Sequence, residues 1–106
     1  GYPAIYKERL LPSISDLVIF EDGFETSTKD LTPQRLAIVN TAIAKLGEWT
    51  EGGFKTALKS LDPKPLTRGD FKSQDIWECD LDDFYRIYFH KKGNSIRLQK
   101  VDKALH

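Results

Sequence analysis

Basic side chains gather between residues 83 and 100, DFYRIYFHKKGNSIRLQK, a stretch typical of two strands around a tight turn. Residues 84–106 carry six lysines and arginines against one carboxylate, whereas residues 1–31 carry three basic and six acidic side chains. The chain as a whole has a formal net charge of zero. A local field can still attract an anionic partner, so the C-terminal third is the candidate surface for binding one.

Alternation of apolar and polar residues predicts which of these side chains share a face of a sheet. Three strands are expected, at residues 75–81, 84–90 and 95–101. A turn centred on KKGN would pair Phe89 with Ile96, and Ile87 with Leu98, on the core face. On the polar face it would place Tyr88 opposite Arg97, Arg86 opposite Gln99, and His90 near Ser95.

The strand that precedes Arg86 has two possible registers. A two-residue turn at Asp82 and Asp83 would place Glu78 opposite Ile87 and bury acidic groups, each at a cost of several kcal/mol. A three-residue loop instead brings Trp77, Cys79 and Leu81 onto the core face. In this second register, which we expect, Glu78 joins the polar face together with Asp80, beside Arg86.

The core face of this sheet needs helices to cover it. Thr32 is a suitable N-cap and Pro33 a suitable first helical residue, and apolar residues follow at helical spacing until Gly47, the expected stop. The same spacing recurs over residues 54–61, where a second, shorter helix is expected to end before DPKP at 62–65. These two segments predict a helical hairpin.

The elements together predict one α+β domain over residues 1–106. Its architecture is an N-terminal helical hairpin packed on an antiparallel sheet of three to four strands. A chain of 106 residues, 40% of them hydrophobic, can bury a modest core. LVIF at 17–20 is a further strand candidate, whereas residues 3–14 fit a helical turn or a strand.

Several classes of site and location are not expected. Cys79 is the only cysteine, which excludes an internal disulfide and is compatible with a reducing compartment. No apolar run approaches the ~20 residues of a membrane span, and the N-terminus lacks the pattern of a secretion signal, so a cytoplasmic protein without membrane association is expected. No cluster of metal ligands, phosphate loop or serine nucleophile motif is present, so we expect neither a metal nor a cofactor.

The segment KPLTRGDFKSQDIWECDLDDFYRIYF, followed by a last strand and a basic, histidine-bearing tail, carries a family resemblance. Over residues 17–106 the chain resembles the RelE/ParE superfamily of toxins from bacterial toxin–antitoxin pairs. The resemblance implies a microbial-ribonuclease-like fold. It also implies, as in many members, that the protein enters the ribosomal A site and cuts mRNA with side chains alone.

The resemblance also assigns roles to residues. The ribose 2′-hydroxyl is the nucleophile, so a base, cationic stabilisers and an acid are needed. Arg86 matches the transition-state stabiliser of the nuclease branch, and His106 matches the terminal histidine that serves one subgroup as general acid. Glu78, on a strand where RelE itself has lysines, is the candidate base; Lys64 stands between two prolines where a related subgroup has a glutamate base. Contacts to RNA are expected from Tyr88, His90, Lys91, Lys92, Arg97, Lys100 and Lys103.

Each of these residues also has a structural interpretation. Arg86 opposite Glu78 would form a cross-strand ion pair worth less than ~1 kcal/mol. Lys91 and Lys92 fit a turn, and His90 ends a strand at the surface. The ring of Tyr88 would stack on a base or cover hydrophobic surface.

Two functional classes therefore stay open. The first is a ribosome-dependent endoribonuclease, which needs Arg86, Glu78 and the terminal basic cluster on one face. The second is a non-catalytic relative, either a gyrase-directed toxin of the ParE branch or a protein that only binds a partner. A toxin of either kind is expected to bind a cognate antitoxin, whose acidic, partly disordered segment would fold onto Arg86, Arg97, Lys100 and Lys103.

Overall fold

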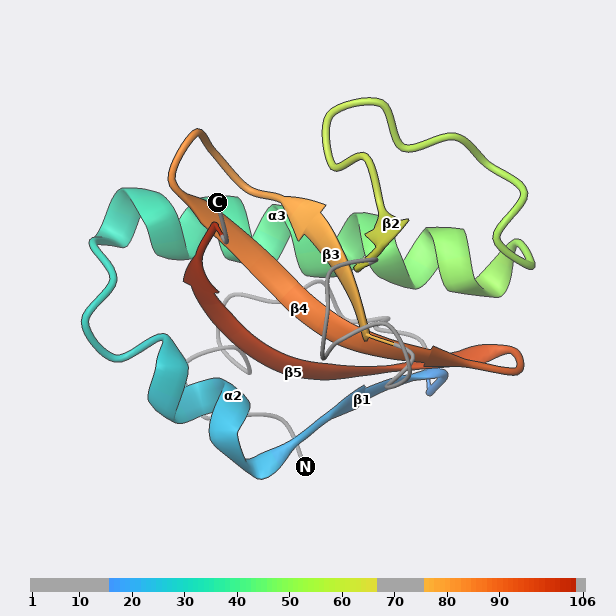
Figure 1. Cartoon of the computed structure of the whole chain (residues 1–106), viewed down its shortest axis with the longest axis horizontal. Helices are drawn as coiled ribbons and strands as arrows, with labels where there is room; N and C mark the ends of the chain where they lie inside the picture. Colours follow the sequence, from blue (N-terminus) through green and yellow to red (C-terminus); the bar gives the residue numbers. More distant parts are fainter. Residues whose placement is uncertain (1–15, 67–75, 105–106) are drawn as a thin grey trace.

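The computed structural model describes residues 16–66 and 76–104, and in these ranges the chain forms one five-stranded sheet with two helices (Figure 1). The elements in chain order are β1 (Val18–Phe20), α2 (Asp22–Ser27), α3 (Pro33–Glu51), β2 (Lys64–Pro65), β3 (Ile76–Asp80), β4 (Tyr85–Lys92) and β5 (Ser95–Lys103). The strand order is β1-β5-β4-β3-β2, with β1 parallel to β5 and the other neighbours antiparallel. The predicted α+β class is confirmed, and the short edge strands β1 and β2 extend the expected sheet.

Helix α3 begins as its sequence predicts but ends later. The side chain of Thr32 accepts a hydrogen bond from the Arg35 backbone N–H at 3.2 Å, and Pro33 is the first helical residue. The predicted stop at Gly47 is wrong, because the helix continues to Glu51. Beyond Gly47 the side chain of Trp49 is buried in the core, and this burial outweighs the ~1 kcal/mol that a glycine costs inside a helix.

The second helix, expected over residues 54–61, does not form, and this prediction is wrong. Gly53 and Phe54 adopt left-handed backbone conformations, with φ of 68° and 63°, which end the helix and turn the chain back. The Phe54 ring then packs edge-on against Trp49, with ring centroids 4.7 Å apart. Residues 52–63 are therefore an irregular segment, and the helix that accompanies α3 is α2.

Strand β3 pairs with β4 in the expected register. Trp77 lies opposite Phe89 and Glu78 opposite Tyr88, so the three-residue loop after Leu81 is confirmed. Trp77 is partly buried against the core cluster, with its ring centroid 6.1 Å from that of Trp49.

The hairpin of β4 and β5 is shifted by two residues from the predicted register. Phe89 lies opposite Leu98 rather than Ile96, because the two turn residues are Gly93 and Asn94, and Gly93 has a φ of 60°. A bulge between Tyr88 and Phe89 adds one more residue, Gln99, on β5. The remaining cross-strand partners of β4 change accordingly: Arg86 faces Asp102, Tyr88 faces Lys100, and His90 faces Arg97.

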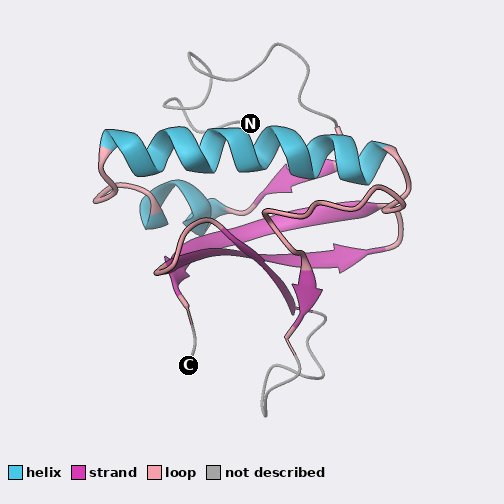
Figure 2. Cartoon of the chain, turned by 90° about the horizontal axis from the view of Figure 1, so that it is seen from above, coloured by secondary structure: helices cyan, strands magenta, loops and turns pink. Residues whose placement is uncertain are grey.

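A shift of two residues keeps the side chains between the turn and the bulge on their predicted faces, so the core assignment is confirmed. Beyond the bulge, Asp102 rather than Gln99 lies opposite Arg86. The four apolar residues expected in the core are fully buried: Ile87, Phe89, Ile96 and Leu98. Figure 2 shows α3 lying across this face of the sheet. In the described ranges no helix is long and apolar enough to cross a membrane.

Candidate functional site

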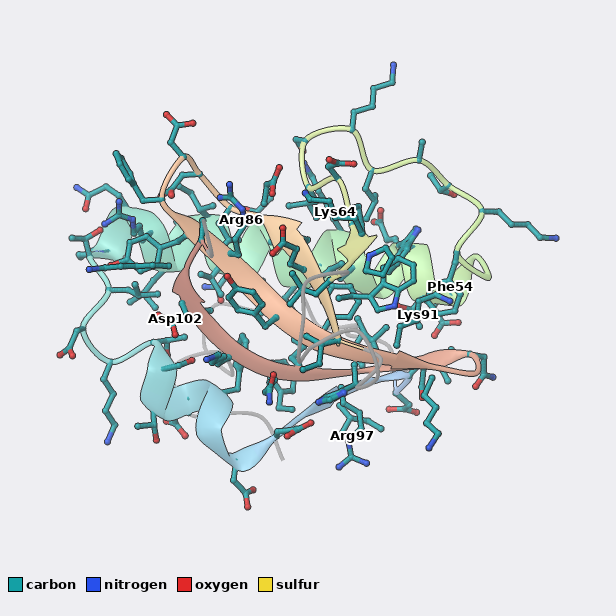
Figure 3. The ribbon with its side chains drawn as sticks, in the orientation of Figure 1. Phe54, Lys64, Arg86, Lys91, Arg97 and Asp102 are labelled. Atoms are coloured by element: carbon teal, nitrogen blue, oxygen red, sulfur yellow. The ribbon has the colours of Figure 1, made fainter. Side chains whose placement is uncertain are left out.

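Five charged residues on β2, β3, β4 and the turn before β2 form a connected set of ion pairs. We call this set the Arg86 cluster; its members are Asp62, Lys64, Glu78, Asp80 and Arg86. Strand β3 lies between β4, which carries Arg86, and β2, which carries Lys64 (Figure 3). Three carboxylates and two cations give the cluster a formal charge of −1.

Arg86 is held in one orientation by its neighbours. Its Nε atom lies 2.9 Å from Asp80 Oδ1, directly across the strand pair. Its Nη1 atom donates to the backbone carbonyls of Asp82 at 2.5 Å and Tyr85 at 2.9 Å. The side chain is only 14% exposed, so the guanidinium is fixed before any ligand arrives.

Lys64 connects the three carboxylates of the cluster. Its Nζ atom lies 3.3 Å from Asp80 Oδ1, 3.4 Å from Asp62 Oδ2 and 3.8 Å from Glu78 Oε1. Partial burial works against the charged amine, but the hydrogen bond and charge of Asp80, followed by those of Asp62, outweigh it and raise the pKa of Lys64. Lys64 therefore stays protonated and supplies a second cation to the cluster.

The predicted cross-strand partner of Arg86 is wrong in one respect. Asp80, not Glu78, forms the ion pair with Arg86, because Asp80 lies directly opposite it. Glu78 lies opposite Tyr88, with its carboxylate 3.8 Å from Lys64. Arg86 and Glu78 share the polar face as expected, whereas His106 lies outside the described residues.

Four of the other side chains expected to meet RNA lie along the same face and already have partners: Tyr88, His90, Arg97 and Lys100. Lys103 does not lie on this face, because it faces Tyr85, which packs against the core. Tyr88 is only 2% exposed, and its hydroxyl donates to the Lys103 carbonyl at 2.7 Å, which leaves little of the ring open to stacking. Lys100 lies 3.3 Å from Asp102. The hydrogen bond from the Lys103 backbone N–H lowers the pKa of Asp102; burial opposes it, and the Lys100 ammonium adds to the lowering.

At the other end of this face, one carboxylate lies between two of the expected RNA contacts. Glu21, which caps α2, has its Oε1 atom 3.8 Å from both His90 Nε2 and Arg97 Nε. Arg97 is 56% exposed, so this contact contributes little to stability. Three of the six lysines and arginines in residues 84–106 therefore lie within 4 Å of a carboxylate: Arg86, Arg97 and Lys100.

Lys91 lies on the opposite side of the sheet from the Arg86 cluster. It faces Ile96 on the core side, and its Nζ atom stands 4.2 Å from the centroid of the Phe54 ring and 5.1 Å from that of Trp77. These residues line a groove of about 520 Å³, which we call the Trp–Lys groove. The groove is not predicted from the sequence, because the spacing around Phe54 indicates a helix, whereas Phe54 belongs to an irregular segment that folds back over Trp49.

Two further chemistries find no support in the described part of the chain. No group of three or more histidine, cysteine or acidic side chains is arranged to hold a metal ion within residues 16–66 and 76–104. Burial raises the pKa of Cys79 to about 12, so its thiol stays protonated and inert.

Comparison with known proteins places this fold in a class. No protein family model and no curated protein matches the sequence. Among solved structures, the RelB–RelE antitoxin–toxin complex from Methanococcus jannaschii matches with a TM-score of 0.59 at 15% identity, over 80% of this chain and 88% of that one. YafQ from E. coli matches with a TM-score of 0.58 at 10% identity, over 81% and 90% of the two chains.

A third structure, the YoeB/ParE toxin from Agrobacterium tumefaciens, matches with a TM-score of 0.58 at 11% identity, over 83% of this chain and 98% of that one. The fold is thus an α+β fold shared with small toxins of toxin–antitoxin pairs. In particular, the chain has the RelE/ParE toxin fold, as the resemblance of its sequence implies.

Proposed function

We propose that this chain is the toxin of a toxin–antitoxin pair and that it cleaves mRNA on the ribosome without a metal ion. The observation that carries the proposal is the Arg86 cluster, in which two cations and three carboxylates lie together on the polar face of a RelE/ParE-like sheet. Positioned cations and an adjacent base are the groups that metal-free phosphoryl transfer to a ribose hydroxyl requires.

In the proposed reaction Glu78 removes the proton of the ribose 2′-hydroxyl, and the 2′-oxygen forms a bond to phosphorus. The bond from phosphorus to the 5′-oxygen breaks, and an acid, for which His106 is the candidate, protonates that oxygen. The products are a 2′,3′-cyclic phosphate and a 5′-hydroxyl. Glu78 suits the role of base because Asp80 is engaged by both Arg86 and Lys64, whereas Glu78 has only the longer contact to Lys64.

Arg86 and Lys64 would stabilise the negative charge that develops on the phosphate oxygens. Arg86 donates through Nε to Asp80 and through Nη1 to two carbonyls, so its Nη2 is available to a phosphate and its Nε becomes available when Asp80 is displaced. The bound phosphate must therefore compete with Asp80. The rate of cleavage would therefore depend on how tightly the substrate is bound.

The proposal is tested by inducing the wild type, Arg86→Ala and Glu78→Gln in a host that lacks the antitoxin, and mapping mRNA ends on translating ribosomes. We expect wild type to inhibit growth and cut mRNA, and both variants to lose cleavage while remaining folded. Growth inhibition by wild type without mRNA cleavage would contradict the proposal.

A non-catalytic toxin, gyrase-directed or binding only, is the second candidate. It is favoured by one observation: the cations of the Arg86 cluster are already matched by carboxylates and the cluster has a net charge of −1. Gyrase inhibition by the purified protein, with no cut in ribosome-bound mRNA, would establish this alternative.

Either candidate would be neutralised by an antitoxin, and the structures that share this fold include RelB–RelE and DinJ–YafQ complexes. We propose that an acidic antitoxin segment binds the polar face at Arg97 and Lys100, which are 56% and 48% exposed. Such binding should weaken with salt, because exposed charges are screened within ~8 Å at physiological ionic strength. Affinity unchanged by reversing the charges of Arg97 and Lys100 would place the antitoxin elsewhere.

A further inference from the structure

The Trp–Lys groove is built by the irregular segment that follows α3. The left-handed residues Gly53 and Phe54 reverse the chain, so that residues 54–63 form one wall while Trp77 of β3 and Lys91 of β4 form the other. Phe54 and Trp77 are partly exposed, and Trp49 is buried at the base of the groove. A volume of about 520 Å³ is within the range of small-ligand sites.

The charge of the groove differs from that of every other basic region described above. Three lysines line it, Lys55, Lys59 and Lys91, with Asp62 as the one acidic residue, so its formal charge is +2. Within the described ranges none of these three lysines forms an ion pair; Asp62 pairs instead with Lys64. The ammonium group of Lys91 lies over the faces of Phe54 and Trp77. These cation–π contacts orient the ammonium group without neutralising its charge.

We propose that the Trp–Lys groove binds a nucleotide of single-stranded RNA, with the base against the exposed parts of Trp77 and Phe54 and the phosphates at the three lysines. Aromatic side chains beside lysines bind single strands without strict sequence preference, because every base has a face that can stack. The lysines would attract phosphate and carboxylate alike, but the exposed parts of two aromatic rings beside them match the flat face of a base, which an acidic peptide lacks. An acidic peptide is therefore the less favoured occupant.

The position of the groove connects it to the proposed cleavage site, and in this respect the inference rests on the proposed function. Asp62 and Pro63 line the groove, and the next residue, Lys64, belongs to the Arg86 cluster. A strand held in the groove would pass around the edge strand β2 and reach Arg86 on the polar face. The groove would then hold a nucleotide that flanks the cleaved one.

The two tryptophans of the chain, Trp49 and Trp77, both line the groove, so intrinsic fluorescence reports its occupancy. The probe is a 12-nucleotide oligouridine, titrated into the purified full chain at several salt concentrations, with a fluorescein-labelled copy for anisotropy. The test variant is Lys55→Ala with Lys59→Ala. The matched control is Lys29→Ala with Lys45→Ala, which removes two exposed lysines outside the groove.

We expect RNA to quench the tryptophans of wild type and of the control variant alike. In the groove variant the slope of log affinity against log salt should fall by about two, since about one unit is lost for each phosphate contact removed. Phe54→Leu, which keeps the apolar wall but removes the ring, should weaken binding about tenfold at constant salt slope.

Equal losses in the groove and control variants would overturn the inference, and so would stronger quenching by a 12-residue polyglutamate than by RNA. The measurement uses free protein and does not depend on cleavage. RNA binding in the groove by a protein that cuts no mRNA would leave the inference standing and remove the ribonuclease proposal. Normal cleavage by a groove variant with unchanged RNA affinity would do the reverse.

Discussion

The Arg86 cluster and the Trp–Lys groove lie on opposite sides of β3 and differ in whether their cations are paired with carboxylates. In the cluster, carboxylates lie within 4 Å of both cations and hold them in place. In the groove, three lysines surround aromatic rings, and within the described ranges none of them is paired. Paired cations are held in place, as a cleavage site requires, whereas unpaired lysines are available to attract a ligand. The Arg86 cluster is therefore suited to RNA cleavage and the Trp–Lys groove to RNA binding.

The largest expected effect concerns the fixed cation of the cluster. Arg86→Lys keeps the charge but cannot reach Asp80 and the two backbone carbonyls at once, so the stabilising group loses its position. Cleavage of ribosome-bound mRNA should fall by about 10²–10³, the usual cost of one such donor. Lys45→Arg, at an exposed position on α3, is the control and should cut at the wild-type rate. Equal cleavage by both would make Arg86 a structural residue.

A smaller effect, on RNA affinity, is expected when a carboxylate is removed from the cluster, so that its cations are less fully paired, as in the groove. Asp80→Asn removes the carboxylate that Arg86 and Lys64 share, so Arg86 Nε becomes available to phosphate and Lys64 keeps only Asp62 and Glu78 as partners. Affinity for oligouridine should rise about tenfold, or ~1.4 kcal/mol. Asp102→Asn, which frees only the half-exposed Lys100, should change it less than about twofold. An Asp80→Asn protein with wild-type affinity would show that Asp80 does not restrain these cations.

Adjacent lysines on β4 test the groove side of the comparison. Lys91 stands over the rings in the groove, whereas Lys92 is exposed at the turn. Lys91→Ala should weaken oligouridine binding about fivefold and lower the salt slope by about one, and Lys92→Ala should have less than about half that effect on the slope. The anisotropy titration used for the groove measures both. A larger loss for Lys92 would move the binding surface to the turn.

The smallest effect concerns the loop that positions Arg86. Burial opposes ionisation of Asp82, but hydrogen bonds from Arg35 and from the backbone of Phe84 and Tyr85 outweigh it and lower its pKa. A carboxyl with a lowered folded-state pKa contributes stability above its unfolded-state pKa, about 4, and loses it as pH falls further. Asp82→Asn should therefore lower the free energy of unfolding by less than about 1 kcal/mol at pH 7 and not at pH 2. Urea denaturation at the two pH values measures this, and an equal loss at both would exclude the ion pair as its cause.

Much of the fold could be predicted from local sequence patterns. The cap at Thr32, the alternation of β4 and the cost of burying Glu78 were enough to predict α3 and to choose the register of β3. A two-residue slip in the hairpin left the faces intact, because side chains alternate with a period of two. The α+β class followed from these elements.

The ion pairs of the site were harder to predict, because they depend on which residues lie opposite each other on neighbouring strands. Asp80 was placed on the correct face, but only the observed register makes it the partner of Arg86. Segment 54–61 has helical spacing, yet it does not form a helix, because Gly53 and Phe54 adopt left-handed conformations and the Phe54 ring packs against Trp49. Tertiary packing of this kind produces no periodic pattern in the sequence, so the groove could not be predicted from it.

The central claim is that the Arg86 cluster supports attack by a ribose 2′-hydroxyl on mRNA held by the ribosome. The direct measurement is primer extension on purified ribosomal complexes with an mRNA whose A-site nucleotide is either ribose or its 2′-deoxy form. We predict that wild-type protein cuts the ribose form, that one 2′-deoxy substitution abolishes the cut, and that Arg86→Ala lowers it by about 10²–10³ on the ribose form. Cleavage that persists on the 2′-deoxy mRNA, or that is equal with Arg86→Ala, would contradict the account.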